Sequence, residues 1–426
     1  MKVLVLDWDG VGLAFSMDCL AAGHSVRLWI PKKGGQRQDT GDGLVERPAD
    51  WQPSMKWADI IVMTDNSHLR TDLKPYFTAG FPIFGANDQS AELELDRAIG
   101  QEVLESNGVD TLPYETFSNF DKAIAYVKRT DQAYACKPWG GLSDKSLTYV
   151  SNSPDDMVFT LERWRDSGTV KGEFMLQQKV DGIEMGIAGW FGPGGWSGWL
   201  EESWEHKKRS AGDLGCNTGE MGTALRYVRT SKLFNRVLKP VEEELAKRGY
   251  VGDVSVNCII DKEKGTPWPM EFTTRLGWPD FNIRVGLHEG DPVEWMLDLM
   301  QGKDTLKAKG ECAIGVVLVH GKFPWEQPAK ELDDFPIYGL TGRNMKQVAL
   351  QAVKTGKAKD PFVTAGNYIA VVRGTGKTFK AAADSAYRVV DQLSVPSNLD
   401  YRIDIGDKLR KQLPILQSFG YAKGAE

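Results

Sequence analysis

Residues 206–222 read HKKRSAGDLGCNTGEMG. The basic or potentially basic side chains of HKKR stand in a row, and a run of Gly, Asn, Thr and Asp follows with almost nothing apolar. A segment of this composition contributes little to a hydrophobic core, because its side chains prefer water. We therefore interpret it as a loop with a function, and the rest of the chain must indicate which function.

Size and charge narrow the class of protein. The chain has 426 residues, 41% of them hydrophobic, which predicts about two or three domains with substantial cores. The net charge is −6, with 52 basic and 58 acidic residues well mixed along the chain. This balance argues against a general nucleic-acid or membrane surface. We expect small-molecule partners, no nucleic acid, no membrane, and a monomer or homodimer.

Cysteine usage and the N-terminus point to the cytoplasm. The five Cys are scattered without any CxxC spacing, and the five His are equally dispersed, which argues against a zinc site or a disulfide framework. The N-terminal MKVLVLDWDG has one Lys and a short apolar run before its acids, which is typical of a buried strand rather than a signal peptide. We expect a cytoplasmic protein.

Short apolar runs alternate with helical patterns over residues 1–88. The runs VLVLD, HSVRLWI, ADIIVMTD and FPIFGA are spaced like parallel strands joined by crossover helices. This pattern predicts a small doubly wound α/β unit. Its ligands would lie at the carboxyl ends of the strands, around Asp7–Gly12 and Thr64–His68.

Further helices and strands follow. Ser90 is expected to cap a helix whose apolar stripe runs as far as Val103, and another helix is expected around 231–249. Strands are predicted at AYACKPW, SLTYV, FMLQQKV, MGIAGWF, VSVNCII, WPMEFTT, AIGVVLVHG and NYIAVVRG, and an Ala-rich helix at 378–393.

Three short motifs suggest other functions. LVLDWDGVG lacks the third Gly of a dinucleotide fingerprint, and the next strand ends in IPKK without an acid for a ribose. The same residues fit the D-x-D-G start of a haloacid-dehalogenase-type phosphatase, with Thr64 in that family's second motif. GTGKT at 374–378 resembles a Walker A end, but Val371 stands where that loop needs Gly, so a strand-to-helix turn is favoured.

Two stretches have the residues to hold the phosphates of ATP. Arg97 follows FGANDQSAELELD, and KPWGGLSDKS places Lys137 at a strand end and Lys145 in a Gly-rich loop. Lysine charges together with free backbone N–H groups suit a polyphosphate. Either Lys alone would be an ordinary surface residue.

Two further stretches suit the nucleoside and the chemistry. In QQKVDGIE, an extended hinge can meet an adenine edge through its backbone, and Glu184 can hold a ribose hydroxyl or a metal. In PMEFTTRLGWPD, alternation places Glu271 and Thr273 on one strand face, with Arg275 following. Mg²⁺ prefers oxygen ligands and bridges phosphates, and an Arg stabilises the charge that develops on an acyl phosphate. Taken singly, these are also the patterns of an amphipathic strand and a structural Glu–Arg pair.

In this order the four stretches resemble an ATP-grasp ligase, most closely glycinamide ribonucleotide synthetase (phosphoribosylamine–glycine ligase). That family has D-H-K-R…D-x-G-P-N-T-G-G-M-G where this chain has EHKKRSAGDLGCNTGEMG, and E-F-N-C-R-F-G-D-P-E where it has EFTTRLGWPD. YRIDIG at 401–406 and GVVLVHGKFP at 315–324 match two further family segments. The resemblance is strong from about residue 85 to 406 and weak before that.

The resemblance implies an α/β protein, α+β in its ATP-grasp part, with three domains. These are a Rossmann-like pre-ATP-grasp domain at 1–88, a two-lobed ATP-grasp domain at 89–308 with a lid at about 135–190, and a small C-terminal domain at 309–426. It implies ATP and Mg²⁺ (or Mn²⁺) as cofactors. ATP would phosphorylate a carboxylate, such as that of glycine, and an amine would then attack the acyl phosphate. Residues 206–222 would close on the substrate and the phosphates.

The resemblance also implies individual roles. The nucleotide would contact Arg97, Lys137, Lys145, Gln178, Val180, Glu184, Asn217 and Thr218. The metal would be held by Glu271 and Thr273, with Asn257 assisting. Arg275, Lys207 and Asp213 would be catalytic, and Gly10, Asp213, Gly219, Met221 and Arg275 would contact the substrates.

Departures from the family cluster on the acceptor side. The family's G-x-G-G-R-E-H-A loop, which contacts phosphoribosylamine, reads DWDGVGLA here, and its G-P-E-x-P-L loop reads TDNSHL. The usual metal-binding Asn is Thr273, and NTGG is NTGE. Asp7 and Asp9 would repel a phosphorylated ribose. We therefore hypothesise a different acceptor amine, or one held differently, and the two acids could receive a cationic amine.

Two rival functions remain open from the sequence. One is a related ligase that makes a peptide or modifies a nucleotide or base. The other is a non-catalytic nucleotide-binding homologue, suggested by Thr273, although the retention of Lys137, Lys145, Glu271 and Arg275 argues against it.

Overall fold

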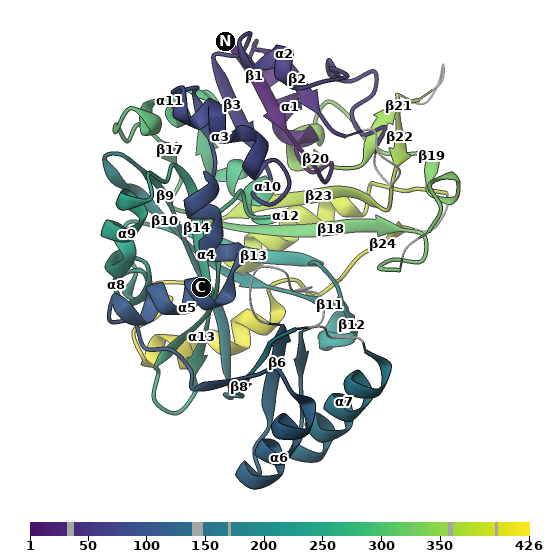
Figure 1. Ribbon diagram of the computed structural model, residues 1–426. Helices are drawn as coiled ribbons and strands as arrows, with labels where there is room; N and C mark the ends of the chain where they lie inside the picture. The colour runs from purple at the N-terminus through teal and green to yellow at the C-terminus, as the bar shows by residue number, and fades with distance from the viewer. Residues whose placement is uncertain (32–37, 139–147, 169–171, 326, 357–360, 397–398) are drawn as a thin grey trace.

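The computed structural model describes residues 1–31, 38–138, 148–168, 172–325, 327–356, 361–396 and 399–426. The chain has an α/β fold, as expected, with a parallel sheet near the N-terminus, a long central sheet and a small antiparallel sheet (Figure 1). Lys145 lies outside the described residues.

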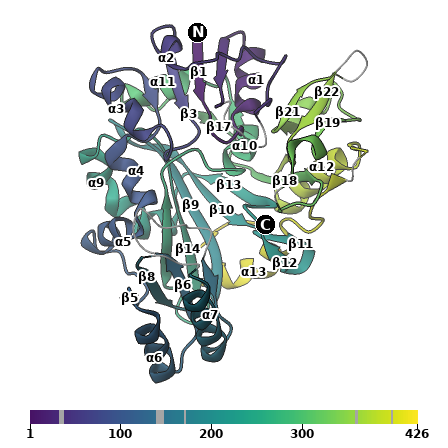
Figure 2. The ribbon, with the colours of Figure 1, turned by 45° about the vertical axis from the view of Figure 1, so that its right-hand side comes forward.

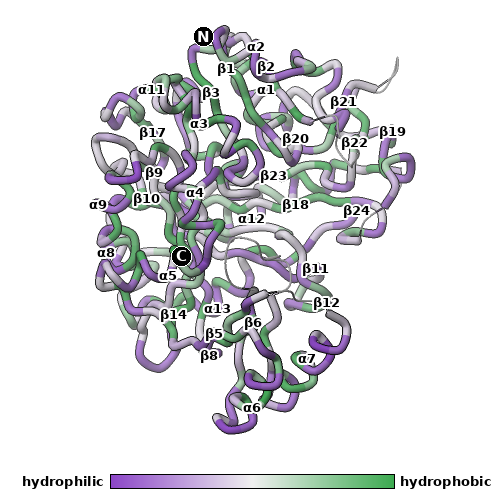
Figure 3. The backbone as a smooth tube through the Cα atoms, in the orientation of Figure 1, coloured by the Kyte–Doolittle hydropathy of each residue, from purple (hydrophilic) through white to green (hydrophobic). Residues whose placement is uncertain are grey.

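The N-terminal unit is the predicted parallel sheet, with strands in the order β2-β1-β3-β4. Its elements are β1 (Lys2–Leu6), α1 (Leu13–Ala21), β2 (Ser25–Trp29), α2 (Gln52–Met55), β3 (Ile60–Met63), α3 (Arg70–Thr78) and β4 (Ile83–Phe84). The strands are buried on both faces, which explains why they read as continuous apolar runs. Figure 3 shows the corresponding hydrophobic colour along β1 and β3.

The helix expected from Ser90 is wrong in its start and in its continuity. It is two helices, α4 (Asp88–Leu95) and α5 (Arg97–Ser106). Asn87 caps α4 because its side chain accepts from the Ser90 N–H, and the extended Asp96 caps α5 through the Ala98 N–H. The break starts α5 at Arg97.

A small antiparallel sheet, in the order β5-β8-β6-β7, forms a separate lobe at the bottom of Figure 1. Its elements are β5 (Tyr114–Phe117), α6 (Phe120–Thr130), β6 (Tyr134–Pro138), β7 (Tyr149–Val150), α7 (Pro154–Ser167) and β8 (Phe174–Gln178). Its own core includes Ile124, Met157 and Phe174, so the lobe is packed independently of the main body. It overlaps the first part of the lid expected at about 135–190.

The central sheet has nine strands in the described chain, in the order β15-β14-β9-β10-β13-β18-β23-β20, with β24 beside β18 (Figure 2). The strands are β9 (Gly182–Gly192), β10 (Gly195–Glu205), β13 (Gly222–Val228), β14 (Gly252–Asp261), β15 (Pro267–Thr273), β18 (Cys312–His320), β20 (Val348–Leu350), β23 (Tyr368–Gly376) and β24 (Leu399–Asp400). The boundary between the second and third expected domains lies between residues 308 and 309. β13 precedes this boundary and β18 follows it, and the two strands pair, so one sheet contains strands of both expected domains. The division proposed there does not coincide with a break in hydrogen bonding.

Helices and short strands surround this sheet. They are β11 (Lys208–Ser210), β12 (Leu214–Asn217), α8 (Lys232–Val237), α9 (Glu242–Lys247), α10 (Asp280–Arg284), β16 (His288–Glu289), α11 (Glu294–Met300), β17 (Lys307–Ala308), β19 (Asp333–Pro336), β21 (Val353–Thr355), β22 (Phe362–Ala365), α12 (Phe379–Val390) and α13 (Asp407–Ser418). The single helix expected at 231–249 is wrong: α8 and α9 are separated around Pro240, which has no N–H to continue the ladder. GTGKT is the expected strand-to-helix turn, since Thr378 caps α12.

Candidate active site

Most of the polar residues of the candidate site lie on one face of four neighbouring strands of the central sheet, β15, β14, β9 and β10. Glu271 and Thr273 alternate with the buried Phe272 on β15, as their spacing predicted. Across the strand pair, Asn257 of β14 lies opposite Glu271, and Ser255 lies opposite Thr273. The cross-strand register therefore gathers oxygen-bearing side chains from two strands on one surface.

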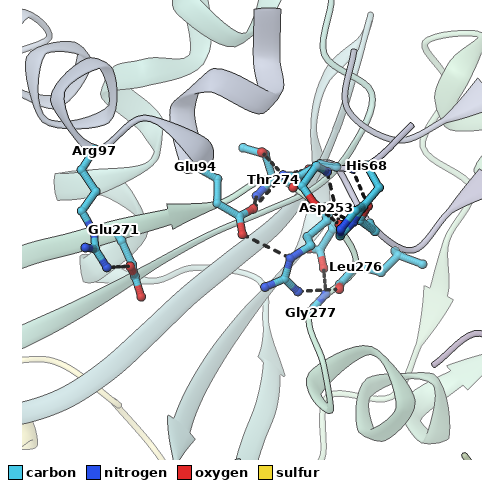
Figure 4. Close-up of polar contacts among 12 residues, drawn as sticks. His68, Glu94, Arg97, Asp253, Glu271, Thr274, Leu276 and Gly277 are labelled. Carbon is cyan, nitrogen blue, oxygen red and sulfur yellow. Dashed lines mark hydrogen bonds and ion pairs between the residues drawn. The ribbon is translucent and has the colours of Figure 1, made fainter. Parts of the chain in front are cut away.

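Arg97 reaches this surface from the first turn of α5. Its guanidinium lies 3.5 Å from a Glu271 carboxylate oxygen and donates to the Thr148 hydroxyl at 3.3 Å. Figure 4 shows Arg97 and Glu271 facing each other. One continuous helix was expected here. The break between α4 and α5 instead places Arg97 in the first turn of α5, from which its side chain reaches Glu271.

Lys137 approaches the same surface from the small lobe. Its Nζ donates to Gln177 Oε1 at 2.8 Å across the β6–β8 pair. Burial lowers the pKa of Lys137 to about 8, with the positive charges of Arg97 and Lys207 acting in the same direction and Glu271 opposing them. A lysine in this state is ready to gain an anionic partner.

Lys207 is surrounded by carboxylates. Its Nζ lies 3.0 Å from Glu205, and the pKa of Lys207 is raised chiefly by Glu205, with Glu184 and Glu271 adding to the effect. Burial raises the pKa of Glu184, and Glu205 adds to that rise. Cations from α5, β6 and the 206–222 stretch thus alternate with carboxylates from β9, β10 and β15.

Arg275 is held by Glu94 of α4. Its Nε donates to Glu94 Oε1 at 3.2 Å, and the pKa of Arg275 is raised chiefly by that carboxylate. Glu94 also accepts from the Thr274 N–H and from Asn66 Nδ2, both at 2.8 Å (Figure 4). Three segments far apart in sequence therefore fix the position of this guanidinium.

The 206–222 stretch folds as the β11–β12 hairpin and contacts the YRIDIG segment. Asp213 accepts from Arg402 at 3.0 Å and from Lys408 at 2.6 Å. Arg402 also donates to the Lys208 carbonyl at 3.0 Å, and Asp404 accepts from the Gly212 N–H at 2.8 Å. Two motifs that the sequence showed separately are one ion-paired unit, with Asp213 engaged by two cations.

His206 anchors the start of this hairpin. It is buried, and burial lowers its pKa to about 4. Its Nε2 accepts from the Gly406 N–H at 3.3 Å, which requires the neutral ring. This histidine therefore has a positioning role at neutral pH.

The remaining candidate residues have varied settings. Gln178 ends β8 and is exposed, Val180 is half-buried, Thr218 donates both N–H and hydroxyl to the Lys207 carbonyl, and Asn217 is exposed at the end of β12. Gly219 packs near Tyr368, where a Cβ would lie 3.1 Å from the hydroxyl. Met221 has 0% exposure, so its side chain belongs to the core and a substrate contact for it rests on the family motif alone. Gly10, at φ 74°, lies in the loop after β1.

Several residues of the site were not identified from sequence. Glu94 binds Arg275, Gln177 and Glu205 hold Lys137 and Lys207, and Asn66 supports Glu94. Each is a polar residue at or near a strand or helix end. Such a position was the available signal, but it does not name the partner.

Residues 96–281 match the model of the phosphoribosylglycinamide synthetase ATP-grasp (A) domain. The chain is an ATP-grasp ligase. The phosphoribosylamine–glycine ligase of Allochromatium vinosum is 26% identical to it over 336 residues, which are 74% of this chain and 75% of that protein. That of Neisseria meningitidis serogroup B is 27% identical over 347 residues, 78% of this chain and 79% of that protein.

Solved structures agree on the fold of this ATP-grasp ligase. The phosphoribosylamine–glycine ligase of Thermotoga maritima gives a TM-score of 0.73 at 19% identity, covering 95% of this chain and 100% of that one. Biotin carboxylase of Campylobacter jejuni gives a TM-score of 0.67 at 12% identity, covering 99% of this chain and 97% of that one. Within the described ranges, the ligase has no helix that is both long and apolar enough to cross a membrane.

Proposed function

We propose that this ligase joins a carboxylate to an amine through an acyl phosphate, in the manner of a phosphoribosylamine–glycine ligase. A carboxylate oxygen attacks the γ-phosphorus of ATP, and the bond to ADP breaks. The amine nitrogen then attacks the acyl carbon, the bond to phosphate breaks, and the nitrogen loses a proton. The relatives' names suggest glycine as the carboxylate. The observation that carries the proposal is the convergence of Arg97, Lys137 and Lys207 beside Glu271.

The nucleotide-binding roles follow from that convergence. Arg97 and Lys137 hold phosphates, since their charges come from two different segments beside one surface, and the resemblance to the family adds Lys145 to this set. The backbone at Gln178 and Val180 meets the adenine, Glu184 meets the ribose or metal, and Asn217 and Thr218 contact the phosphates. The lobe that carries Lys137 closes over ATP, which keeps water from the acyl phosphate.

The donor set suits a magnesium ion that shares its ligands with ATP. Among the described residues, no group of three or more His, Cys, Asp or Glu side chains is arranged to hold a metal alone. Glu271, Thr273 and the adjacent Asn257 offer oxygen atoms, which fits Mg²⁺ bound by one carboxylate together with phosphates and water. When bound, the ion neutralises phosphate charge.

A phosphatase function is not supported by the geometry of Asp7. Its side chain is fully buried, and both of its oxygens accept hydrogen bonds from the loop that follows it. A nucleophilic carboxylate must instead be exposed to its substrate.

Trapping the acyl phosphate tests the proposal without knowledge of the acceptor. Purified protein is incubated with ATP, Mg²⁺, hydroxylamine and a panel of amino acids that includes glycine, and ADP and hydroxamate are both measured. We expect hydroxamate and ADP in equal amounts with one amino acid, and neither product in Lys137→Ala. ADP without hydroxamate would indicate an ATPase, and the absence of ADP throughout the panel would favour the non-catalytic homologue.

Lys137 should make ATP binding depend on pH. Its pKa in the free protein is about 8, so the ammonium that ATP requires is lost as pH rises through that value. Between pH 7 and pH 9 the Kd for ATP should rise about tenfold, because binding must then take up a proton. Calorimetry across this range measures the slope. Lys137→Arg, which stays charged, should flatten it, and an unchanged slope in that variant would contradict the role.

A further inference from the structure

The loop after β1 carries backbone N–H groups at the start of helix α1. In doubly wound sheets such a loop is where an anionic ligand group is held, because the N–H groups and the helix dipole both favour negative charge. In this chain the loop spans Asp7–Gly12 and begins at the carboxyl end of β1. The question is therefore whether these N–H groups remain available.

The backbone N–H groups of this loop donate to the side-chain carboxylate of Asp7. Asp7 Oδ1 accepts from the N–H groups of Gly10 at 3.0 Å and Val11 at 3.1 Å, and Oδ2 accepts from that of Gly12 at 2.7 Å. The hydroxyl of Thr64, the residue that follows β3, donates to Oδ1 at 2.9 Å. All four groups donate hydrogen bonds to Asp7. The loop and Thr64 therefore surround this carboxylate as they would surround a bound anion.

The fit is close. Asp7 has no exposed surface, and a Cβ on Gly12 would lie 2.9 Å from Val5 Cγ1 and 3.1 Å from Asp7 Oδ2. Burial raises the pKa of Asp7, while its hydrogen bonds from Gly12, Val11 and Thr64 oppose that rise. A phosphate here would find the N–H groups of Gly10, Val11 and Gly12 engaged by Asp7, and it would meet a buried negative charge a few ångströms away, which is strongly unfavourable.

The neighbouring surface is also acidic and aromatic. Asp65 and Asp9 contribute to the raised pKa of Arg275, after the larger effect of Glu94, so both carboxylates act on the guanidinium of the candidate site. Trp8 and His68, from the loops after β1 and β3, stack with ring centroids 4.2 Å apart and an interplanar angle of 5°. This side of the site therefore has negative charge and ring surface where an acceptor phosphate would need positive charge.

We infer that Asp7 is a specificity-determining residue that fills the anion-binding loop, so that this ligase takes an acceptor amine without a phosphate group. The part of this inference that concerns the acceptor rests on the proposed function. The occupation of the loop by Asp7 does not depend on that function. The acceptor class is a neutral or cationic amine, recognised beside Asp9, Asp65 and the Trp8–His68 pair.

Binding of ribose 5-phosphate, a sugar phosphate without the amine, tests the occupied loop. Calorimetry is done on the full-length wild-type protein, on Asp7→Gly, which empties the loop, and on Asp7→Asn, which keeps the shape and removes the charge. Asp72→Asn is the matched control, because it removes an exposed carboxylate of the same N-terminal unit, on α3, without opening the loop. Thermal melting confirms that each variant is folded.

We expect no measurable binding to wild type or Asp72→Asn, and binding at least about tenfold tighter in Asp7→Gly or Asp7→Asn. Binding by wild type, or no gain in either folded Asp7 variant, would overturn the assignment of Asp7. A mass spectrum of the wild-type reaction with glycine and phosphoribosylamine made in situ tests the acceptor class. A phosphorylated amide product would overturn it, and its absence while hydroxamate still forms would support it. Loss of hydroxamate itself would count against the proposed function and leave the calorimetry valid.

Discussion

Arg275→Ala should lower the rate of hydroxamate formation by about a thousandfold while changing the Kd for ATP by no more than about threefold. The guanidinium lies after β15, beyond Glu271, and donates to Glu94 at 3.2 Å, and it is not one of the cations proposed to bind phosphate. It is therefore placed to stabilise charge that develops during transfer to the carboxylate. Rates are measured under saturating ATP and amino acid, and ATP affinity is measured separately by calorimetry.

Two further variants separate charge from geometry. Arg275→Lys keeps the charge but loses the planar fork, so we expect it to recover only part of the rate. Arg70→Ala removes a guanidinium that pairs with Asp88 at 3.1 Å, and it should leave the rate unchanged. If Arg275→Ala weakens ATP binding as strongly as it slows the reaction, Arg275 is a nucleotide-binding residue instead.

Arg284→Met should lower the free energy of unfolding by about 3–5 kcal/mol. Arg284 of α10 is 1% exposed and lies between Glu201 of β10, at 3.1 Å, and Asp253 of β14, which it contacts through both terminal nitrogens. Those carboxylates are 0% and 3% exposed, so the substitution leaves two buried acids without their cation. Urea titration followed by tryptophan fluorescence measures the change, since the guanidinium lies 4.2 Å from the Trp190 ring.

Arg410→Met provides the matched control. Arg410 is 42% exposed on α13 and pairs with Asp407 within the same helix, and its loss should cost less than about 0.5 kcal/mol. Asp253 also accepts from the Gly277 N–H at 3.2 Å, so Arg284→Met should slow catalysis through the loop that carries Arg275. Equal effects of the two substitutions would show that the buried ions contribute no more than a surface pair.

Local sequence patterns predicted one strand face of the candidate site and the N-terminal sheet. Alternation along β15 placed Glu271 and Thr273 on one face, because strand side chains point to opposite sides in turn. Continuous apolar runs gave the parallel sheet of the N-terminal unit, because both of its faces are covered. Both patterns extend over only a few consecutive residues, so they can be recognised in a sequence.

The break between α4 and α5 was harder to predict. The expected helix through residue 95 is interrupted at Asp96, because a side chain that caps the next helix competes with continuation of the first. The change of one backbone conformation aims Arg97 at Glu271. Propensity and apolar spacing do not report such a break.

The sequence by itself determined the order of the motifs and the class of ligase, and it predicted which residues bind ATP. Only the tertiary structure decided that Asp213 is paired with Arg402, 189 residues away, and that Glu94 holds Arg275, 181 residues away. It also decided that Asp7, which a motif presents as a nucleophile, is enclosed by its own loop and by Thr64. The reason is physical: the spacing of residues along a chain fixes which face a side chain occupies, but the partner that satisfies a buried charge comes from whichever distant segment the fold brings there.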